Sequence, residues 1–496
     1  MIGTVVLVLL GILTLAYLWL RRNYEYWTRQ GLPQPPTVFG FGNFKDVFLT
    51  RNIPGLIYNK IYKDYSGHDA VGMYEFFTPA LLVRAPDLVK RVMASDFSSF
   101  HDNATSVSKK LDPHFSQDPF IARGEEWKLY RARLNAVGTA TRIKEIYPYM
   151  KEVVTRLDAY LDENKSKIVD TKELATLFTM DNVSSTVFGI NSNCFSDPEA
   201  RFRKLAALIA TEQLKFKWQT MVLFYLPRVR DILRIRFVPT EVNEFVENMV
   251  KDVIDYRKKK GETRNDLFQF FLNKEQGNKL SDVMFYSMTF FIEGFETSAM
   301  TASGVLYELA LNPEVQRTLH EEVFQAFEDS NLDLDLETII RLPYLEKVVQ
   351  EAQRKYPVMY AYVRECTRPI TLDIDGKSVN IPVGSPVVVP VYAIHHDPQY
   401  YPDPEVFDPE RFSEENKALR PAYTYMPFGE GPRICPGVRF AMAQVKLLVA
   451  SIVSKYKILR CDKTPDRLTL SRGSMFLVVP NEKQWVHLEK RKLCSK

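Results

Sequence analysis

The stretch Pro427-Phe428-Gly429-Glu430-Gly431-Pro432-Arg433-Ile434-Cys435-Pro436-Gly437 places one cysteine in a loop rich in glycine and proline. A helical pattern begins directly after it, at Val438. A cysteine at the positive end of a helix meets free backbone N–H groups, which favour thiolate over thiol. Glycines let the backbone pass close to a large flat group, and Pro436 suits the first helical turn. The sequence therefore predicts an anionic sulfur in a rigid loop, a suitable axial ligand for a haem iron.

The motif Phe-x-x-Gly-x-Arg-x-Cys-x-Gly is carried by Phe428, Gly431, Arg433, Cys435 and Gly437. It resembles the haem-binding loop of the cytochrome P-450 superfamily. The alternative is a buried structural cysteine in a loop, and three further motifs argue against it. The resemblance implies a mainly α fold with small β-sheets and haem (iron protoporphyrin IX) as cofactor. It implies Cys435 as the metal ligand, with Phe428 and Arg433 also contacting the haem.

The second motif is Glu351-Ala352-Gln353-Arg354. Residues three apart face the same side of a helix, and such a pair on a surface contributes little to stability. Its place upstream of the cysteine loop resembles the family's Glu-x-x-Arg element, with Arg411 as the third member. A carboxylate between two guanidinium groups can be buried, because every charge then has a partner. The resemblance implies a structural role near the haem.

The third motif joins Trp127 and Arg131, which lie four residues apart and so project together from a helix. A core tryptophan beside a surface arginine explains these two residues nearly as well. In the family a matching pair binds a haem propionate, and Arg364 and Arg433 match further propionate-binding arginines. Arginine binds carboxylates in a bidentate fork. Close family members place another arginine where this chain has His101, so that contact is either missing or made by His101.

The fourth motif, Glu293-Gly294-Phe295-Glu296-Thr297-Ser298, lies inside an apolar segment, 280–311, that is predicted to be one helix. Thr297 can donate a hydrogen bond to a carbonyl one turn earlier and so loosen the helix. An exposed polar patch is the alternative, but the apolar flanks favour burial. The motif resembles the family's oxygen-activating element, which implies catalytic roles for Thr297 and for Glu296 as a proton relay. Glu293 replaces the family's usual small residue, and it either adds charge near the substrate or turns toward water.

Residues 1–20 contain no charged side chain, and a helix of that length spans about 30 Å, enough to cross a bilayer core. Arg21 and Arg22 follow, which favours a cytosolic position for that side. A cleaved signal peptide is the alternative, but the flank lacks the small residues of a cleavage site. We expect a transmembrane signal anchor at 1–20, a basic and proline-rich hinge at 21–42, and a haem-binding catalytic domain at 43–496. Resemblance to microsomal members implies the endoplasmic reticulum membrane, with the catalytic domain facing the cytosol.

Composition excludes other classes of function. The chain has 65 Lys and Arg against 61 Asp and Glu, a net charge of +4, which does not indicate a nucleic-acid partner. The sequence has no zinc-ligand spacing and no phosphate-binding glycine loop. Its five cysteines are scattered, which fits a reducing compartment better than a disulfide framework.

Helical periodicity dominates the chain, and strand-like runs are short. Helices are predicted at 143–161, 200–214, 242–259, 280–311 and 313–328. Strands are predicted at 70–74 and 80–83 as a hairpin, at 371–381 around an Asp375-Gly376 turn, and at 386–391 and 475–479.

The residues within these motifs look most like those of microsomal animal enzymes, especially insect members linked to detoxification. The resemblance implies a monooxygenase that inserts one oxygen atom from O2 into a lipophilic small molecule such as a xenobiotic, hormone or lipid. The sequence carries no flavin or nicotinamide motif, so electrons are expected from a partner. The membrane anchor and the resemblance imply NADPH–cytochrome reductase of the endoplasmic reticulum as that partner, with a cytochrome b-type protein as a further donor. Arg439 and Lys446 are predicted docking charges. The expected pocket walls are 100–115, 207–218, 291–297, 358–363 and 475–476.

Two alternatives stay open at this point. One is a haem-thiolate isomerase that rearranges peroxides without electrons, against which the presence of Thr297 argues. The other is a non-catalytic membrane haem protein that binds a hydrophobic ligand.

Overall fold

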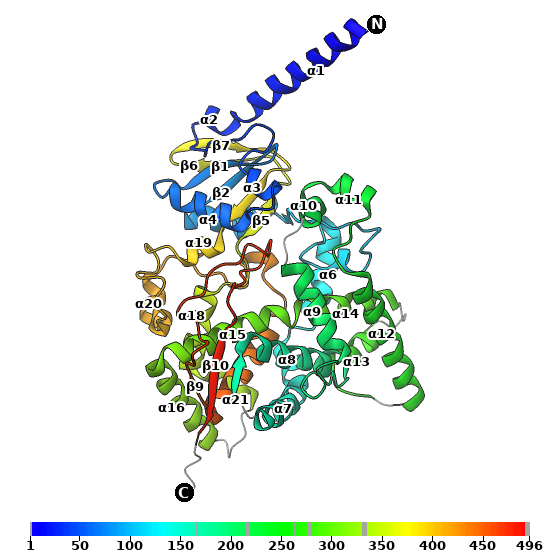
Figure 1. Cartoon of the computed structure of the whole chain (residues 1–496), viewed down its shortest axis with the longest axis vertical. Helices are drawn as coiled ribbons and strands as arrows, with labels where there is room; N and C mark the ends of the chain where they lie inside the picture. Colours follow the sequence, from blue (N-terminus) through cyan, green and yellow to red (C-terminus); the bar gives the residue numbers. More distant parts are fainter. Residues whose placement is uncertain are drawn as a thin grey trace.

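The computed structural model describes residues 2–164, 167–214, 218–261, 263–274, 280–329 and 335–491. Helices form most of the body, and the small sheets lie at its margins (Figure 1). This agrees with the predicted mainly α fold with small β-sheets. One of the five cysteines, Cys494, lies outside the described residues.

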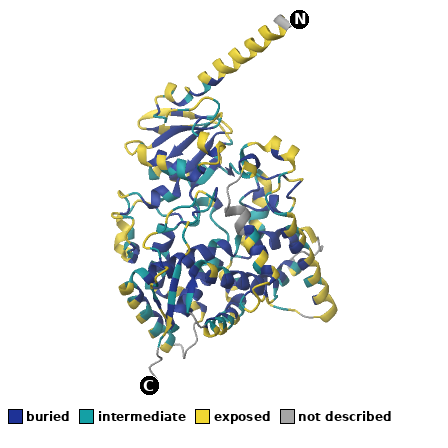
Figure 2. Ribbon diagram, viewed as in Figure 1, coloured by how far each residue is buried: buried dark blue, intermediate teal, exposed yellow. Residues whose placement is uncertain are grey.

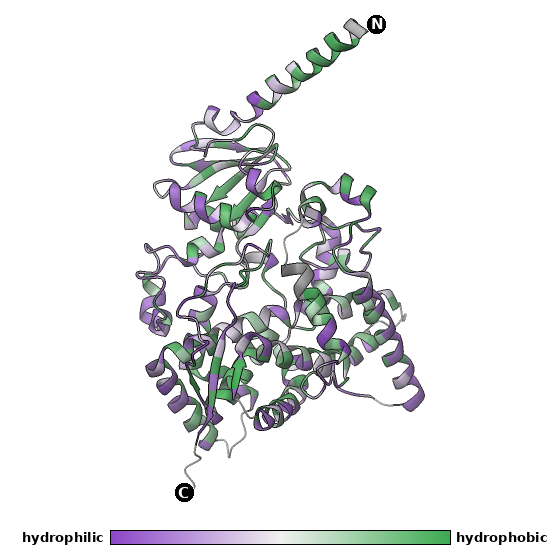
Figure 3. Ribbon diagram, viewed as in Figure 1, coloured by the Kyte–Doolittle hydropathy of each residue, from purple (hydrophilic) through white to green (hydrophobic). Residues whose placement is uncertain are grey.

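Helix α1 (Ile2–Asn23) projects away from the body (Figure 1). Its side chains from Thr4 to Trp19 are exposed and mostly hydrophobic (Figures 2 and 3). The segment Thr4–Asn23 has a mean hydropathy of 2.1 and is only 6% buried. A helix this long and apolar can cross a membrane.

The short helix α2 (Tyr26–Arg29) connects α1 to the largest sheet. Trp27 is fully buried, its ring fills the space beside Gly72, and its Nε1 donates to the Met73 carbonyl at 3.1 Å. The start of the predicted hinge is therefore packed against the body.

The largest sheet has the order β1-β2-β8-β5-β3. Its strands are β1 (Ala70–Glu75), β2 (Thr78–Val83), β8 (Pro386–Val389), β5 (Tyr362–Glu365) and β3 (Asp102–Asn103). The predicted hairpin is confirmed, because β1 and β2 pair antiparallel with Ala70 opposite Val83. Strand β5 pairs with β3 so that Arg364 lies opposite Asn103. The sheet thereby brings Arg364 to the end of the segment that leads to Trp127.

The second predicted hairpin is also confirmed, as β6 (Ile370–Ile374) and β7 (Lys377–Ile381). Asp375 and Gly376 both have positive φ, as a tight two-residue turn requires. The three-stranded sheet of β4 (Ile168–Asp170), β10 (Trp485–Lys490) and β9 (Tyr456–Leu459) was not predicted.

Two strand predictions need correction. The prediction for 475–479 is wrong, because this run is a loop with a single isolated bridge between Met359 and Leu477. Its apolar residues face a cavity instead of a neighbouring strand. The strand predicted at 386–391 ends at Val389, because Pro390 precedes the short helix α19 (Val391–His395).

Helix α15 (Glu296–Leu311) is buried along nearly its whole length. It packs between α8 (Thr171–Val183), α18 (Pro343–Lys355) and α21 (Val438–Lys455). The predicted helix 280–311 is wrong in one respect: α14 ends at Glu293, and α15 begins at Glu296 after a turn. The other four predicted helices are confirmed with small changes at their ends.

The remaining helices complete the body around this core. They are α3 (Lys45–Phe48), α4 (Pro54–Asp64), α5 (Pro86–Lys90), η1 (Arg91–Ser95), η2 (Phe115–Gln117), α6 (Gly124–Asn135), α7 (Ala140–Glu163), η3 (Ser184–Phe188), α9 (Arg201–Leu214), α10 (Trp218–Tyr225), α11 (Pro227–Leu233), α12 (Thr240–Lys260), α13 (Leu267–Lys274), α14 (Leu280–Glu293), α16 (Pro313–Asp329), α17 (Leu336–Arg341), η4 (Pro409–Phe412), α20 (Glu414–Leu419) and η5 (Gly431–Arg433).

Candidate active site

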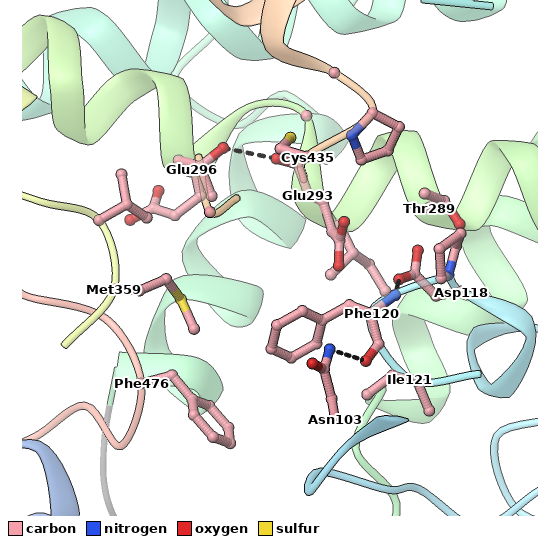
Figure 4. Close-up of a pocket in the computed structure, with 18 of the residues that line it drawn as sticks. Asn103, Asp118, Phe120, Ile121, Thr289, Glu293, Glu296, Met359, Cys435 and Phe476 are labelled. Atoms are coloured by element: carbon pink, nitrogen blue, oxygen red, sulfur yellow. Dashed lines mark hydrogen bonds between the residues drawn. The ribbon is translucent and has the colours of Figure 1, made fainter. Parts of the chain in front are cut away.

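A cavity of about 380 Å³ lies between the cysteine loop, α6, α14 and α15 (Figure 4). Most of its wall is apolar and aromatic. Parts of four of the predicted wall segments line it, those at 100–115, 291–297, 358–363 and 475–476. The fifth, 207–218, has side chains largely outside the described residues. The wall near it includes Gln219, Thr220, Leu223 and Phe224 of α10.

The Cys435 side chain lines this cavity from the start of α21, as the sequence predicts. The loop holds it by hydrogen bonds from Cys435 N to Phe428 O (2.9 Å) and from Ile434 N to Gly431 O (3.0 Å). Burial raises the pKa of the thiol to about 11, although the N–H of Gly437 lowers it. The N–H of Gly437 at the start of α21 therefore lowers the pKa of the thiol in the predicted direction, but burial outweighs it. A bound cation has to displace the proton, as metals do when they ligate thiols.

Gly431 has a different reason to be glycine from the one inferred from sequence. Its φ is +72°, and an added Cβ would lie 2.1 Å from the Met93 carbonyl oxygen. The backbone of the loop is thus pressed against η1 at Gly431, whereas Gly429 and Gly437 of the same loop line the cavity. Gly138 makes a similar approach, since its Cβ would lie 2.6 Å from the Pro436 carbonyl oxygen. The cysteine loop is fixed from two sides by backbone contacts.

Arg433 anchors the same loop from the cavity wall. Its Nη2 lies 3.0 Å from Asp102 Oδ1, and its Nη1 donates to Pro119 O at 2.8 Å. The guanidinium group lies over the Trp127 ring, 4.6 Å from the centroid. His101 Nδ1 lies 2.8 Å from the same Asp102 carboxylate. His101 is therefore paired with Asp102 and does not line the cavity.

Arg131 and Arg364 complete a group of three arginines on this wall. Arg131 donates to the Ile434 carbonyl, and Arg364 donates to Asn103 Oδ1. The Nε of Arg364 is buried and has no hydrogen-bond partner. Burial and the nearby charge of Arg433 lower the pKa of Arg364 to about 9.

These residues fit a haem. An unpaired guanidinium donor and two crowded positive charges call for anionic acceptors, and haem carries two carboxylates. Haem iron also needs an axial ligand, and Cys435 offers its sulfur to the same apolar cavity. Five residues besides Cys435 were predicted from the sequence to contact the haem, and all of them line the cavity: Trp127, Arg131, Arg364, Phe428 and Arg433.

The break between α14 and α15 is made by side chains. Thr297 Oγ1 donates to Glu293 O at 2.8 Å, which is the predicted bond to the preceding turn. Gln444 on α21 donates from Nε2 to Gly294 O (3.0 Å) and to Ser298 Oγ (2.6 Å). Every one of these bonds takes a backbone or hydroxyl group that an unbroken helix would use otherwise. Gln444 was not found from the sequence, because no motif marks it.

Glu296 lines the cavity but is almost completely buried, at 1% exposed. Its Oε2 accepts from Lys172 Nζ at 2.8 Å, while its Oε1 has no hydrogen-bond partner. The Lys172 side chain is 29% exposed. The two side chains together connect solvent with the cavity. Lys172 was missed by sequence reasoning, because it lies on α8, far from Glu296 in the chain.

Glu293 also lines the cavity, where it meets Asp118 from the loop after η2. The structure therefore resolves the alternative left by the sequence: Glu293 adds an acid to the pocket and does not turn toward bulk water. Asp118 was not predicted.

The Glu-x-x-Arg motif forms the expected buried ion-pair cluster. Glu351 accepts from Arg354 Nε (2.7 Å) and Nη2 (2.8 Å), and Arg411 Nε lies 3.4 Å from its Oε1. The side chains of Glu351 and Arg354 are fully buried. The cluster joins α18 to η4 and lies outside the cavity wall.

The predicted docking charge Lys446 is wrong. It is 1% exposed, lies 2.6 Å from Glu346 and donates to Ile340 O at 2.8 Å. Arg439 is exposed, and its Nη1 donates to Gly138 O at 2.9 Å.

Comparison with known proteins agrees with this geometry. A family model described as Cytochrome P450 matches residues 32–487. The chain belongs to the cytochrome P450 family. It is 34% identical to cytochrome P450 6k1 of Blattella germanica, with 95% of this chain and 94% of the relative covered. It is 35% identical to the probable cytochrome P450 6a13 of Drosophila melanogaster, over 96% of each chain.

A third relative, cytochrome P450 9e2 of Blattella germanica, is 30% identical over 97% of this chain and 96% of its own. The predicted resemblance to insect cytochromes P450 is thus confirmed over nearly the whole chain. Family membership establishes the haem cofactor and the monooxygenase class.

Proposed function

We propose that this cytochrome P450 oxidises a lipophilic small molecule in the cavity described above, with haem held by Cys435. The observation that carries the proposal is the meeting of the buried Cys435 sulfur, the Thr297 segment and the arginine wall in one apolar cavity. Bound haem would supply activation of O2 and transfer of one oxygen atom. The protein supplies binding, orientation and protons.

Six residues hold the cofactor in this proposal. Cys435 is the iron ligand, and its loop is pinned to η1 at Gly431. The unpaired Nε of Arg364 takes a propionate, together with Arg131 and Arg433. Trp127 supports the Arg433 guanidinium from below. Phe428 holds the cysteine backbone through its carbonyl and presents its side chain to the cavity.

Proton delivery is assigned to Thr297 and Glu296. The Thr297 hydroxyl donates to Glu293 O, which leaves its oxygen as an acceptor facing the cavity. Glu296 Oε1 is buried without a partner and is positioned to bind a water molecule. Lys172 links Glu296 to solvent, so a proton can pass from the surface to Glu296 and then through water to the Thr297 region.

The N-terminal segment supports the location in this proposal. Residues 1–20 act as a signal anchor, 21–42 as the hinge and 43–496 as the catalytic domain. The exposed apolar surface of α1 supports insertion into the endoplasmic reticulum membrane, and Arg21 and Arg22 support a cytosolic catalytic domain. Electrons then come from NADPH–cytochrome reductase, with a cytochrome b-type protein as a second donor. Exposed Arg439 remains a proposed docking charge.

Reconstitution with reductase tests this proposal. The full chain, NADPH, O2 and a panel of lipophilic compounds should give oxygenated product in proportion to NADPH consumed. Thr297→Ala should keep NADPH consumption but lose most product, because the proton path ends at that hydroxyl. Thr318→Ala on exposed α16 removes a similar bond to the preceding turn (3.2 Å) and should change neither.

The same assay separates the alternatives. Conversion of a peroxide without NADPH would identify an isomerase. Haem and ligand binding without NADPH consumption would identify a non-catalytic haem protein. Either result would contradict the proposed monooxygenase.

A further inference from the structure

Two carboxyl groups from distant parts of the chain face each other in the cavity. Glu293 ends α14, and Asp118 follows η2, which packs against α14. Thr289 lies one helical turn before Glu293 and therefore on the same face. Figure 4 shows Asp118, Thr289 and Glu293 along one side of the cavity, with Met359 and Phe476 across from them.

Asp118 of this acidic pair is buried, Glu293 is half-buried, and the pair is incompletely satisfied. Asp118 is fully buried, and its Oδ1 accepts from Phe120 N at 2.7 Å. Its Oδ2 is buried without a hydrogen-bond partner. Thr289, which is 6% exposed, also has a buried hydroxyl without a partner. Unpaired buried polar atoms cost free energy, so their presence beside a cavity indicates a ligand that completes them.

The charge of the pair is also uncompensated by the protein. Burial raises the pKa of Asp118 to about 6, although the backbone N–H of Phe120 and the neighbouring side chains of Thr289 and Glu293 lower it. Burial and the charge of Asp118 raise the pKa of Glu293 well above its usual value. Among the described residues, no cationic side chain is a main influence on the pKa of either carboxyl. The pair thus keeps a proton in order to stay buried, and an entering cation can take the place of that proton.

The surroundings restrict the kind of cation. Within the part of the chain that the structure describes, no group of three or more His, Cys, Asp or Glu side chains is arranged to hold a metal ion. The wall next to the pair is apolar or aromatic, including Phe120 and Ile121, and Phe476 lies across the cavity from it. Such walls suit an organic cation whose body is hydrophobic, and aromatic faces attract ammonium groups.

We propose that Asp118 and Glu293 bind the protonated nitrogen of a lipophilic amine, so that this enzyme selects basic substrates over neutral ones of the same shape. The N–H of the ammonium group donates a hydrogen bond to one carboxylate, and the nitrogen lies beside the other. The hydrophobic part of the molecule then fills the cavity. This inference rests on the proposed function, because the pair lines the cavity in which oxidation takes place.

Equilibrium dialysis of the haem-loaded full chain tests the inference without measuring oxidation. The probes are N,N-dimethyl-4-phenylbutylamine, which is protonated at pH 7.4, and its neutral carbon isostere 5-methyl-1-phenylhexane. A detergent blank corrects both for partitioning. Charge-assisted hydrogen bonds in a buried site predict a preference of about tenfold to a hundredfold for the amine. The double variant Asp118→Asn, Glu293→Gln should remove this preference and leave binding of the isostere unchanged.

The variant Asp112→Asn is the matched control. Asp112 is another buried aspartate, six residues away, but it does not line the cavity. It should keep the preference for the amine. Equal binding of amine and isostere to the unchanged protein would overturn the proposal. Loss of both probes in the double variant would also overturn it, because the pair would then only support the fold.

Failure of this inference can be told apart from failure of the proposed function. Dialysis reports recognition of the amine, whereas the product yield with reductase reports oxidation. A protein that oxidises neutral compounds but shows no amine preference would refute the acidic pair alone. A protein that prefers the amine but forms no product would refute the proposed oxidation alone.

Discussion

Replacing Asp118 with asparagine should stabilise the protein at neutral pH. Burial raises the pKa of this carboxyl from 3.8 to about 6. Ionising it in the folded protein therefore costs about 3 kcal/mol more than in the unfolded chain. The pKa of Asp118 is higher in the folded protein than in the unfolded chain. Its contribution to the free energy of unfolding is therefore fully present below about pH 4 and is lost as pH rises through about 6. Asparagine avoids this loss and keeps the oxygen that accepts from Phe120 N.

The expected gain depends on pH in a defined way. Linkage predicts about 3 kcal/mol at pH 7.5 and about half of that at pH 5, where the folded carboxyl is mostly protonated already. Urea unfolding of the haem-loaded full chain in detergent, followed by circular dichroism at both pH values, measures the difference. The midpoint should move to higher urea at pH 7.5 with the slope unchanged.

The control is Asp112→Asn, which should act in the opposite direction. Both oxygens of Asp112 accept backbone N–H groups, from Phe237 and Val238, each at 3.1 Å. Asparagine can accept only one of them, so the variant should lose about 1–3 kcal/mol at pH 7.5. If Asp118→Asn destabilises the protein, or stabilises it equally at both pH values, the account of an uncompensated acidic pair is refuted.

Three further changes test other parts of the structure. Gly431→Ala, whose Cβ would lie 2.1 Å from Met93 O, should abolish recovery of haem-loaded protein. The control Gly384→Ala also has positive φ, but it has no atom within 4 Å and does not line the cavity, so it should cost only about 1–2 kcal/mol; equal haem contents would contradict this. Lys172→Met should slow product formation about tenfold at constant haem content, because Glu296 loses its link to solvent. The control Lys172→Arg should keep most of the rate. An unchanged rate in Lys172→Met would exclude this proton path. Deletion of residues 2–23 should move the protein from membranes to the supernatant after a carbonate wash, and full retention in the pellet would show that α1 is not the main anchor.

Features that depend on neighbouring residues were predictable from the sequence. The loop around Cys435 and the bond from Thr297 to Glu293 O each involve groups within one or two turns of the chain. The hairpins were predictable for the same reason, because the Asp375-Gly376 turn needs two residues with positive φ. The strand predicted at 475–479 failed because a short apolar run suits a cavity wall as well as a sheet.

Features that depend on packing between distant segments were not predictable. Lys172 reaches Glu296 from α8, and Gln444 reaches Gly294 from α21. Asp118 had no motif, and its meeting with Glu293 follows only from the contact between η2 and α14. The pKa of Cys435 depends on packing for a related reason: the helix N-terminus is local, but the burial that outweighs it comes from the whole fold. Tertiary contacts decide both the partners and the desolvation of these groups.

The central claim is that Cys435 is the ligand of a haem iron in this cavity. The most direct test is the absorption spectrum of the reduced, carbon monoxide-bound full chain, compared with that of Cys435→Ala. The account predicts a strongly red-shifted Soret band, typical of thiolate ligation, that disappears in the variant. A Soret band at the position typical of a histidine ligand, or a red-shifted band that persists in Cys435→Ala, would contradict it.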